Sequence, residues 1–435
     1  MTKYILVLNC GSSSVKFNLF AVLANLSLQS VLQGIAEEIG NPGKSRVKYE
    51  WQNKKQTVKV DFTDHRMALT RIFSILEQVG IKQESMVAVG HRVVHGGDRY
   101  TGSVRIDGKV IQTISQLIPI APLHNPPNLT GIIESMHLLP NVPQVAVFDT
   151  AFHATMPSYA YRYAIPDLWY RTYGVRKYGF HGTSHMYVAR RAALKLGIPF
   201  SRFNGITAHL GNGCSLTKIE AGRSMDTSMG FTPLEGVIMG TRSGDIDPAV
   251  IEYVANRLVE DRGLSKEQAF EAVLHDLNTE CGLKAIGKTN MMQDIRQRAL
   301  EGDEEAAEAI RMYAYRIAKY IGQYWATLPW VDAIVFTAGL GENEAYVRKQ
   351  ILSFLSGLDI QIDENENEKR HEEVIIGKSN VRQEHPLSVM VIPTNEEIVI
   401  GYDTLYLGYL NQPIPDVYPF EREESSLSGK CFPEA

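Results

Sequence analysis

The sequence has few of the features that would assign it to a specialised class of protein. It contains only four cysteines, Cys10, Cys214, Cys281 and Cys431, and none of them forms a Cys-x-x-Cys pair. A disulfide framework or a thiolate metal site is therefore not expected. Reduced thiols and a cytoplasmic location are the default interpretation.

Long apolar runs and a strong net charge are also lacking. The longest apolar runs have the length of strands and fall well short of a membrane span. The run Tyr4–Leu8 is too short for the core of a signal peptide. A net charge of −5 gives no reason to expect nucleic acid or an anionic membrane as a partner.

Two segments of the chain share one pattern, in which a strand, a small polar turn and a second strand follow one another. One is Tyr4–Phe20, with the turn at Gly11–Ser14, and the other is Gly205–Ile219, with the turn near Gly213. Glycine at such a bend lets backbone N–H groups close around an anion. The second segment alone fits a simple β-hairpin with an Asn-Gly turn equally well. Because 435 residues exceed the usual size of a single core, the pair predicts two copies of one nucleotide-holding fold.

The rest of the chain alternates between strand and helix patterns. Buried strands are predicted at Met86–Gly90, Pro143–His153, Asp332–Ala338 and Ser388–Asn395. Helices are predicted at Thr63–Val79, Met186–Leu196, Ala249–Arg262, Lys266–Leu277, Glu304–Leu328 and Glu396–Leu407. We expect irregular structure in a Gly-rich loop at Phe231–Pro248, a turn at Gly339–Asn343 and a loosely ordered tail from Asn411.

One segment matches a well-known nucleotide motif. Gly282–Thr289 fits the P-loop pattern, which requires a buried strand directly before it. The preceding Lys266–Glu280 has helical spacing instead, so the match is interpreted as accidental. A P-loop NTPase that depends on Lys288 stays open as an alternative.

Histidines and arginines among glycines raise two further questions. His91/His95 and His181/His185 have the spacing of zinc ligands on a helix, but strand and loop surroundings favour a role without metal. Arg92 and Arg242 lie beside glycines rather than in charged runs. An anion clamp and a structural salt bridge are equally open for these two arginines.

Ten motifs in one order make the chain resemble the acetate/propionate kinase family of the actin–chaperone–sugar kinase superfamily. The motifs are NCGSSSVKF (Asn9–Phe17), GHRVVHGG (Gly90–Gly97), APLHNPPN (Ala121–Asn128), VFDTAFH (Val147–His153), KYGFHGTSH (Lys177–His185), AHLGNGCS (Ala208–Ser215), DTSMGFTPLEG (Asp226–Gly236), MGTRSGDIDP (Met239–Pro248), FTAGLGEN (Phe336–Asn343) and IPTNEE (Ile392–Glu397). The resemblance extends to about Gly408.

The resemblance implies an α/β protein of two domains with a duplicated ribonuclease-H-like (actin/sugar-kinase-like) fold and an active-site cleft between them. Residues 1–150 with 396–435 would form the first domain, and residues 151–395 would form the second, with most of the nucleotide site. The implied reaction is reversible in-line transfer of a phosphoryl group from ATP to acetate. It would require Mg²⁺, for which Mn²⁺ can substitute, and the protein would be a homodimer.

The resemblance also implies a set of site residues. The transferring phosphoryl group would be surrounded by Arg92, Asp149, His181 and Arg242, with His124 and His209 near it. Mg²⁺ would be bound by Asn9 and Glu396. The phosphates of ATP would be held by Ser12, Ser14, Lys16, His209, Leu210, Gly211, Asn212 and Gly213. The adenosine would be held by Asp294, Ile295, Arg296, Gly339, Leu340, Gly341, Glu342 and Asn343.

These residue types suit phosphoryl transfer to a carboxylate. Such an acceptor is already ionised at pH 7, so catalysis reduces to alignment and charge stabilisation. The two arginines would clamp oxygens, His181 would donate a hydrogen bond, and Asp149 would orient an arginine or the nucleophile. The methyl group would lie in an apolar pocket of Val94, Leu123, Phe180 and Pro233. Since one methylene is worth only about 1–3 kcal/mol, acetate is favoured over propionate rather than exclusive.

Four points stay open at the level of sequence. A propionate or other short-chain fatty acid kinase would use the same mechanism. An actin- or chaperone-like conformational ATPase would share the phosphate hairpins without a small substrate. Glu280–Arg296 replaces a Ser/Gly-rich loop of the family, which leaves the choice between ATP and GTP undecided. No function is assigned to the tail after Leu410.

Overall fold

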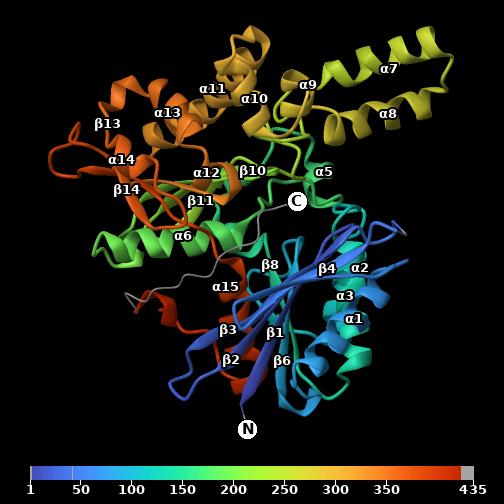
Figure 1. The fold of residues 1–435 in the computed structure, drawn as a ribbon. Helices are drawn as coiled ribbons and strands as arrows, with labels where there is room; N and C mark the ends of the chain where they lie inside the picture. Colours follow the sequence, from blue (N-terminus) through green and yellow to red (C-terminus); the bar gives the residue numbers. More distant parts are fainter. Residues whose placement is uncertain (1, 42, 423–435) are drawn as a thin grey trace. The chain divides into compact units, whose positions relative to one another are not determined.

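The computed structural model describes residues 2–41 and 43–422. Contacts divide the chain into two compact units (Figure 1). Unit 1 comprises the described residues up to Ala154 together with those from Asn395 onward, and unit 2 comprises Thr155–Thr394. Each unit is described by itself below.

Unit 1 is built on an eight-stranded sheet with the order β5-β4-β3-β2-β1-β6-β8-β7. Its strands are β1 (Lys3–Cys10), β2 (Ser14–Val22), β3 (Leu28–Glu37), β4 (Arg46–Trp51), β5 (Lys54–Lys59), β6 (Met86–Val93), β7 (Val104–Arg105) and β8 (Gln144–Phe148). Strands β1 to β5 form an antiparallel meander, whereas β1, β6 and β8 run parallel.

Helices cover both faces of the central strands of unit 1, so these strands are continuous apolar runs rather than alternating ones. The helices are α1 (His65–Gln78), α2 (Gly108–Gln116), α3 (Asn125–Leu138) and α15 (Glu396–Thr404), which continues as a π-helix at Leu405–Leu410. Helix α3 packs on β1 and β6, and α15 packs on β1, β6 and β8. The second packing is close, because a Cβ at Gly90 would lie 2.2 Å from Thr404 Oγ1.

Unit 2 contains a seven-stranded sheet with the order β11-β10-β9-β12-β15-β14-β13. Its strands are β9 (Gly205–Leu210), β10 (Cys214–Glu220), β11 (Arg223–Thr227), β12 (Ala333–Thr337), β13 (Gln361–Ile362), β14 (Val374–Ser379) and β15 (Leu387–Val391). Its helices are α4 (Ser158–Tyr161), α5 (Asp167–Arg171), α6 (Gly182–Lys195), α7 (Ala249–Arg262), α8 (Lys266–Thr279), α9 (Leu283–Gly287), α10 (Met292–Leu300), α11 (Glu304–Thr327), α12 (Ala338–Asn343), α13 (Ala345–Ser353) and α14 (Glu364–Asn367).

The two sheets repeat one arrangement. The run β3-β2-β1-β6-β8 in unit 1 has the same order and strand directions as β11-β10-β9-β12-β15 in unit 2. In both, an antiparallel hairpin is followed by two parallel strands that are connected through helices. The duplicated α/β fold expected from the two hairpins is confirmed.

Several predicted elements differ from the structure. Gly339–Asn343 is not a turn but most of the short helix α12, whose first residue, Ala338, has a left-handed backbone (φ 64°). Helix α6 begins at Gly182, four residues before the predicted start. Its preceding residue, His181, is not one of the residue types that usually mark a helix start, so the sequence carried no start signal there.

The tail from Asn411 is not loosely ordered throughout, so that prediction is wrong for its first part. Tyr418 and Phe420 are buried. The Tyr418 hydroxyl donates to Asp403 Oδ1 at 2.7 Å, and its ring stacks on Phe420 with centroids 4.9 Å apart. Two aromatic side chains thus anchor a segment whose composition is otherwise polar. The tail beyond residue 422, including Cys431, lies outside the described residues.

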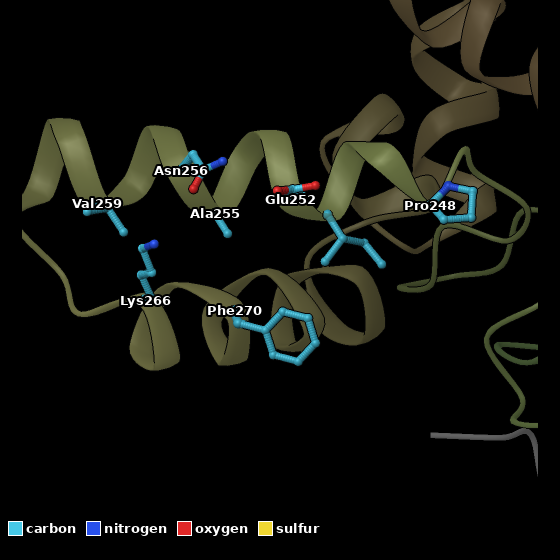
Figure 2. Close-up of a pocket in the computed structure, with 8 residues that line it drawn as sticks. Pro248, Glu252, Ala255, Asn256, Val259, Lys266 and Phe270 are labelled. Atoms are coloured by element: carbon cyan, nitrogen blue, oxygen red, sulfur yellow. The ribbon is translucent and has the colours of Figure 1, made fainter. Parts of the chain in front are cut away.

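Helices α7 and α8 form a hairpin that extends from the rest of unit 2 (Figure 1). A groove between them is lined by side chains that include Pro248, Glu252, Lys266 and Phe270 (Figure 2). It contains none of the predicted site residues. Within residues 2–41 and 43–422, no helix combines the length and hydrophobicity that a membrane crossing needs.

Candidate active site

One cluster of predicted site residues gathers in unit 1, at the carboxyl ends of neighbouring parallel strands. Asn9 and Arg92 lie near the ends of β1 and β6, and Asp149 directly follows β8. Arg92 donates from Nε to Asp149 Oδ1 (2.9 Å) and from Nη2 to Oδ2 (2.6 Å). Its Nη1 lies 3.4 Å from Asn9 Oδ1. Asp149 is 1% exposed, so this two-pronged ion pair fixes the plane of the guanidinium.

Glu396 joins the same cluster from the first turn of α15, with Oε2 3.5 Å from Arg92 Nε. Lys16 lies opposite Asn9 in the β1–β2 ladder. Glu397, which the sequence reasoning did not select, belongs to this group as well. Burial raises the pKa of the Glu397 carboxyl, whereas Lys16 and Arg92 lower it. The adjacent pair of glutamates in the IPTNEE motif was the available signal.

Asn128 of the APLHNPPN motif holds two of the strand ends of this cluster in place. Asn128, in the first turn of α3, donates to the carbonyl of Cys10 (2.7 Å) and accepts from the N–H of Val94 (3.0 Å), which links the ends of β1 and β6. Val94 is buried. His124 directly precedes α3, and Leu123 before it is 57% exposed.

The oxygen donors of this cluster fit a magnesium ion. Mg²⁺ prefers oxygen ligands, usually takes only one or two carboxylates from the protein, and keeps several waters. Asn9 and Glu396 offer one amide oxygen and one carboxylate, and Arg92 links both. The part of the chain that is described contains no group of three or more His, Cys, Asp or Glu side chains arranged to hold a metal.

A second cluster lies in unit 2, around the turn between β9 and β10. His181 Nε2 and Arg242 Nη1 both point to Gly213, because a Cβ built on that glycine would lie 3.4 Å from the first and 3.6 Å from the second. The glycine therefore leaves a small space that is bordered by a ring nitrogen and a guanidinium. Such a space suits an anion.

His181 is held in a strained position next to this turn. It has a left-handed backbone (φ 56°), which is uncommon for a residue with a side chain. Its ring stacks on His209 with centroids 4.1 Å apart, and Nδ1 lies 2.8 Å from Ser215 Oγ. A strained backbone conformation is retained only where the surrounding contacts hold it in place, and such conformations occur often at functional sites.

Arg242 is presented by the Gly-rich loop 231–248. Burial lowers the pKa of its guanidinium. The loop is tied to the hairpin turn, since Gly240 N–H donates to the Asn212 carbonyl at 2.9 Å. At its base, Asp245 accepts from the Gly236 N–H (2.7 Å) and from the Tyr320 hydroxyl of α11 (2.6 Å).

The remaining residues predicted to contact the phosphates or the acyl group vary in exposure. Leu210 and Gly211 are buried at the end of β9, and Asn212 is exposed at the turn. Phe180 is buried, and the carbonyl of Pro233 lies 3.5 Å from Arg242 Nη1. In unit 1, Ser12 is exposed and Ser14 is half-buried.

Two segments predicted to hold adenosine lie together in unit 2. Arg296 Nε of α10 is 3.5 Å from Glu344 Oε2, which directly follows α12. In α10, Asp294 is exposed and Ile295 is buried; in α12, Gly339 is exposed, Leu340 is half-buried and Gly341 is buried.

The polar side chains of α12 are engaged within unit 2. Glu342 accepts hydrogen bonds from the backbone N–H groups of Ala338 (2.8 Å) and Thr394 (3.0 Å), which joins the start of α12 to the end of the β15 segment. Asn343 donates to the Gly339 carbonyl (2.9 Å). Arg348, which the sequence reasoning did not select, donates to the carbonyls of Gly341 and Glu342.

The P-loop match does not have the surroundings of a P-loop. Helix α8, not a strand, precedes it, and its residues form the short helix α9. Lys288 is exposed and paired with Glu305. The interpretation of this match as accidental is confirmed.

Comparison with known proteins adds independent evidence on the family of this chain. The sequence model of the Acetokinase family matches residues 4–402. The acetate kinase of Carboxydothermus hydrogenoformans is 45% identical over 409 residues, which cover 93% of this chain and 98% of that protein. The crystal structure of a Francisella tularensis propionate kinase has a TM-score of 0.84 and 41% identity, covering 94% of this chain and all of that one. That of Porphyromonas gingivalis acetate kinase has a TM-score of 0.82 and 40% identity, covering 93% and 99%.

The sheet that occurs twice in this chain, shared with both solved structures, places it among the two-domain α/β proteins of the actin and sugar-kinase type. Within that class the match extends over nearly the whole chain and includes the motifs that supply both clusters. The chain belongs to the Acetokinase family.

Proposed function

We propose that this chain transfers the γ-phosphoryl group of ATP to the carboxylate of acetate, giving acetyl phosphate and ADP, and catalyses the reverse reaction. The observation that carries the proposal is the space at Gly213, bordered by His181 Nε2 and Arg242 Nη1, in a member of the Acetokinase family. We propose that the cluster of unit 1 and the cluster of unit 2 both serve this one reaction.

The reaction needs charge stabilisation more than proton transfer. Acetate is ionised at neutral pH, so an oxygen of its carboxylate attacks phosphorus without a general base. The bond to the bridging oxygen of ADP breaks as the new P–O bond forms, and negative charge spreads over the three equatorial oxygens. Arg242 and the Nε2 of His181 are the donors that we assign to those oxygens.

Arg92 is assigned to the acetate carboxylate and the phosphoryl group. Two of its donors are engaged by Asp149, which leaves the Nη1 side directed to Asn9. Asp149 thereby acts as the orienting carboxylate rather than as a base. Its geometry supports this assignment, because both of its oxygens are occupied by hydrogen bonds from Arg92.

Asn9 and Glu396 would hold Mg²⁺, together with water and ATP oxygens. Bound there, the ion would offset charge on the phosphate oxygens during transfer. Lys16, Ser12, Ser14 and residues 209–213 would contact the phosphates of ATP, and residues 294–296 with 339–343 would contact the adenosine. Val94, Leu123, Phe180 and Pro233 would surround the methyl group, with His124 nearby.

The second candidate substrate is propionate. One solved relative, from Francisella tularensis, is a propionate kinase with 41% identity to this chain. Buried, β-branched Val94 favours the shorter acid. The difference of one methylene corresponds to roughly a 10- to 200-fold preference at most.

We further propose a cytoplasmic homodimer whose two domains have the bounds 1–150 with 396–435 and 151–395. Family membership supports both the substrates and the dimer. Size-exclusion chromatography with light scattering tests the dimer, since a mass near 97 kDa supports it and a mass near the 48.6 kDa of one chain contradicts it.

The test of function is acyl-phosphate formation from MgATP, trapped with hydroxylamine, with acetate, propionate and butyrate compared at equal concentration. Acetate well ahead supports the proposal. Faster acyl-phosphate formation from propionate would be consistent with the mechanism but would contradict acetate as the preferred substrate. ATP hydrolysis without any acyl phosphate would favour a conformational ATPase. Lys288→Ala serves as a control, because near-normal acyl-phosphate formation by that variant excludes a P-loop mechanism.

A further inference from the structure

A chain of hydrogen bonds connects His181 to the interior of unit 2. His181 Nδ1 lies 2.8 Å from Ser215 Oγ, and the same oxygen lies 2.8 Å from His185 Nε2. On the other side of that ring, His185 Nδ1 lies 2.7 Å from Thr207 Oγ1. Ser215, His185 and Thr207 are each 0% exposed. These three residues come from β10, α6 and β9. The hydrogen bonds between them therefore form only when unit 2 is folded.

The direction of these hydrogen bonds follows from Thr207. Among the residues that the structure describes, the Thr207 hydroxyl has one hydrogen-bond partner, His185 Nδ1. A buried hydroxyl hydrogen without an acceptor costs free energy, so Thr207 must donate to this nitrogen. A nitrogen that accepts carries no hydrogen, and neutral His185 then carries its hydrogen on Nε2.

The remaining bonds follow in turn. His185 Nε2–H donates to Ser215 Oγ, so the single hydrogen of the Ser215 hydroxyl is available for His181 Nδ1. Ser215 has no third partner in the part of the chain that is described. His181 Nδ1 therefore accepts, and the hydrogen of neutral His181 is on Nε2, the nitrogen that faces Gly213.

The opposite direction of hydrogen-bond donation, from His181 toward Thr207, is unfavourable. It would require Thr207 to accept from His185, which leaves its hydroxyl hydrogen unpaired in the core. A doubly protonated His185 would have the same defect, because its Nδ1–H would again leave the Thr207 hydroxyl hydrogen without an acceptor. The neutral, one-directional arrangement satisfies every group with the partners present.

We propose that Thr207, His185 and Ser215 are positioning residues that fix the tautomer of His181, so that Nε2 presents a hydrogen at Gly213. The catalytic use of this hydrogen rests on the proposed function, because Nε2–H is then the donor to a phosphoryl oxygen. In the other tautomer, a nitrogen lone pair would face an oxygen anion at that point. The tautomer itself is a property of the protein without any ligand.

The first test is ¹⁵N NMR of the imidazole nitrogens in full-length protein labelled at histidine, without nucleotide, at pH 7.5. His181→Asn serves only to assign the His181 signals. We expect a protonated Nε2 and an unprotonated Nδ1 for both His181 and His185. A protonated Nδ1 on His181 overturns the proposal, whatever the enzyme assay gives.

The second test compares two variants of nearly equal shape at one position. Thr207→Val removes the donor to His185, so His185 and then His181 can populate the other tautomer. We expect Thr207→Val to lower kcat about three- to tenfold, with the KM for ATP within twofold of the original value. Thr207→Ser keeps the hydroxyl and should restore most of kcat and the original His181 signals.

Thr217→Val provides the matched control. Thr217 is also a fully buried threonine of the same sheet, but its hydroxyl donates to Thr227 at 3.2 Å, outside this chain of bonds. It should leave the His181 tautomer and kcat unchanged. A loss of kcat equal to that of Thr207→Val, or a Thr207→Val protein with an unchanged His181 tautomer, contradicts the proposal.

The outcome is separable from that of the proposed function. If wild-type protein forms acyl phosphate but His181 carries its hydrogen on Nδ1, the inference fails and the function stands. If no acid is phosphorylated but the tautomers are as expected, the structural inference stands and the function fails. The wild-type NMR measurement needs no variant to fold, so it decides the point even if Thr207→Val is unstable.

Discussion

Arg242 is the residue whose removal tests the unit 2 cluster most directly. Arg242→Ala leaves the Gly213 turn and its backbone hydrogen bonds in place but removes the charge beside it. We expect turnover to fall about 10²- to 10³-fold, as when a preorganised donor to the transition state is lost, while ATP still binds. Steady-state kinetics with a separate binding titration provides the measurement. Turnover within fivefold of wild type would exclude the assigned role.

The sequence offered a reason to select single residues where the chemistry is local, and their roles stay predictions. Arg92 and Arg242 were noted because they lie beside glycines rather than in charged runs, and the resemblance, not the spacing, decided between an anion clamp and a salt bridge. Asp149 follows a buried strand, which is where ligands of parallel sheets lie. In contrast, Ser215 and Thr207 have no such signal, because a buried hydroxyl in a strand is ordinary. Their role depends on a histidine delivered by a separate helix.

The turn between β9 and β10 contributes a space, because Gly213 has no side chain. A Cβ there would meet His181 and Arg242 at ordinary contact distances, and the backbone is not left-handed. Gly213→Ala should therefore fold with unchanged or slightly higher stability but occupy the space proposed for phosphate. We expect kcat/KM for ATP to fall at least about tenfold, since a bound oxygen and a methyl group cannot share that space.

Gly322→Ala is the control for this prediction. Gly322 lies inside α11, toward its C-terminal end, and a Cβ added there would have nothing within 4 Å, so alanine should stabilise the helix without affecting catalysis. Thermal unfolding and kinetics of both variants give the comparison. A Gly213→Ala enzyme with normal kcat/KM would show that the space at this turn does not receive phosphate.

The loop that carries Arg242 depends on its attachment to α11. Tyr320→Phe removes the donor to Asp245 and should loosen residues 236–245. We expect faster hydrogen exchange in that segment and a kcat lowered about two- to fivefold, consistent with the loss of one hydrogen bond. The measurement is hydrogen-exchange mass spectrometry alongside kinetics.

Tyr324→Phe, about one turn further along α11, is the matched control. The Tyr324 hydroxyl is buried without a hydrogen-bond partner among the described residues, so its removal should leave loop exchange unchanged and stability equal or higher. Equal exchange in the two variants would contradict the anchoring role of Asp245 and Tyr320.

At the level of elements, regular patterns were predictable and special backbone geometry was not. The β9–β10 hairpin follows from apolar runs around an Asn-Gly turn, and α7 was predicted to the residue. Helix α12 was missed because glycines disfavour helix, whereas here Arg348 satisfies the carbonyls at its end. Tyr418 and Phe420 were missed because their partners, Tyr402 and Asp403, belong to a helix earlier in the chain.

The molecule as a whole should lose stability as the pH falls, and the loss should begin in unit 1. Burial lowers the pKa of His91 and of His95 to about 4, against 6.5 in the unfolded chain. Between these values the unfolded chain binds protons that the folded unit does not, so the free energy of unfolding decreases as pH falls below 6.5. At pH 5 the decrease is roughly 2 kcal/mol for each histidine.

Urea unfolding at pH 7 and pH 5, with hydrogen exchange to separate the units, provides the measurement. The double variant His91→Gln, His95→Asn should show a smaller decrease, because its amides do not titrate. His137→Gln, at an exposed position, is the control. An equal decrease in the double variant and the wild type would mean that other groups govern the acid response.

The course of the chain through the two units has a consequence for its synthesis. Unit 2 is formed by one continuous stretch and is complete once Thr394 has left the ribosome. All strands of unit 1 precede unit 2 in the chain, but α15, which covers β1, β6 and β8, is made only after the whole of unit 2. A nascent chain therefore carries a sheet with one apolar face uncovered while unit 2 is being made. The unit made first is the one that must wait to fold, which makes it the part most in need of a chaperone.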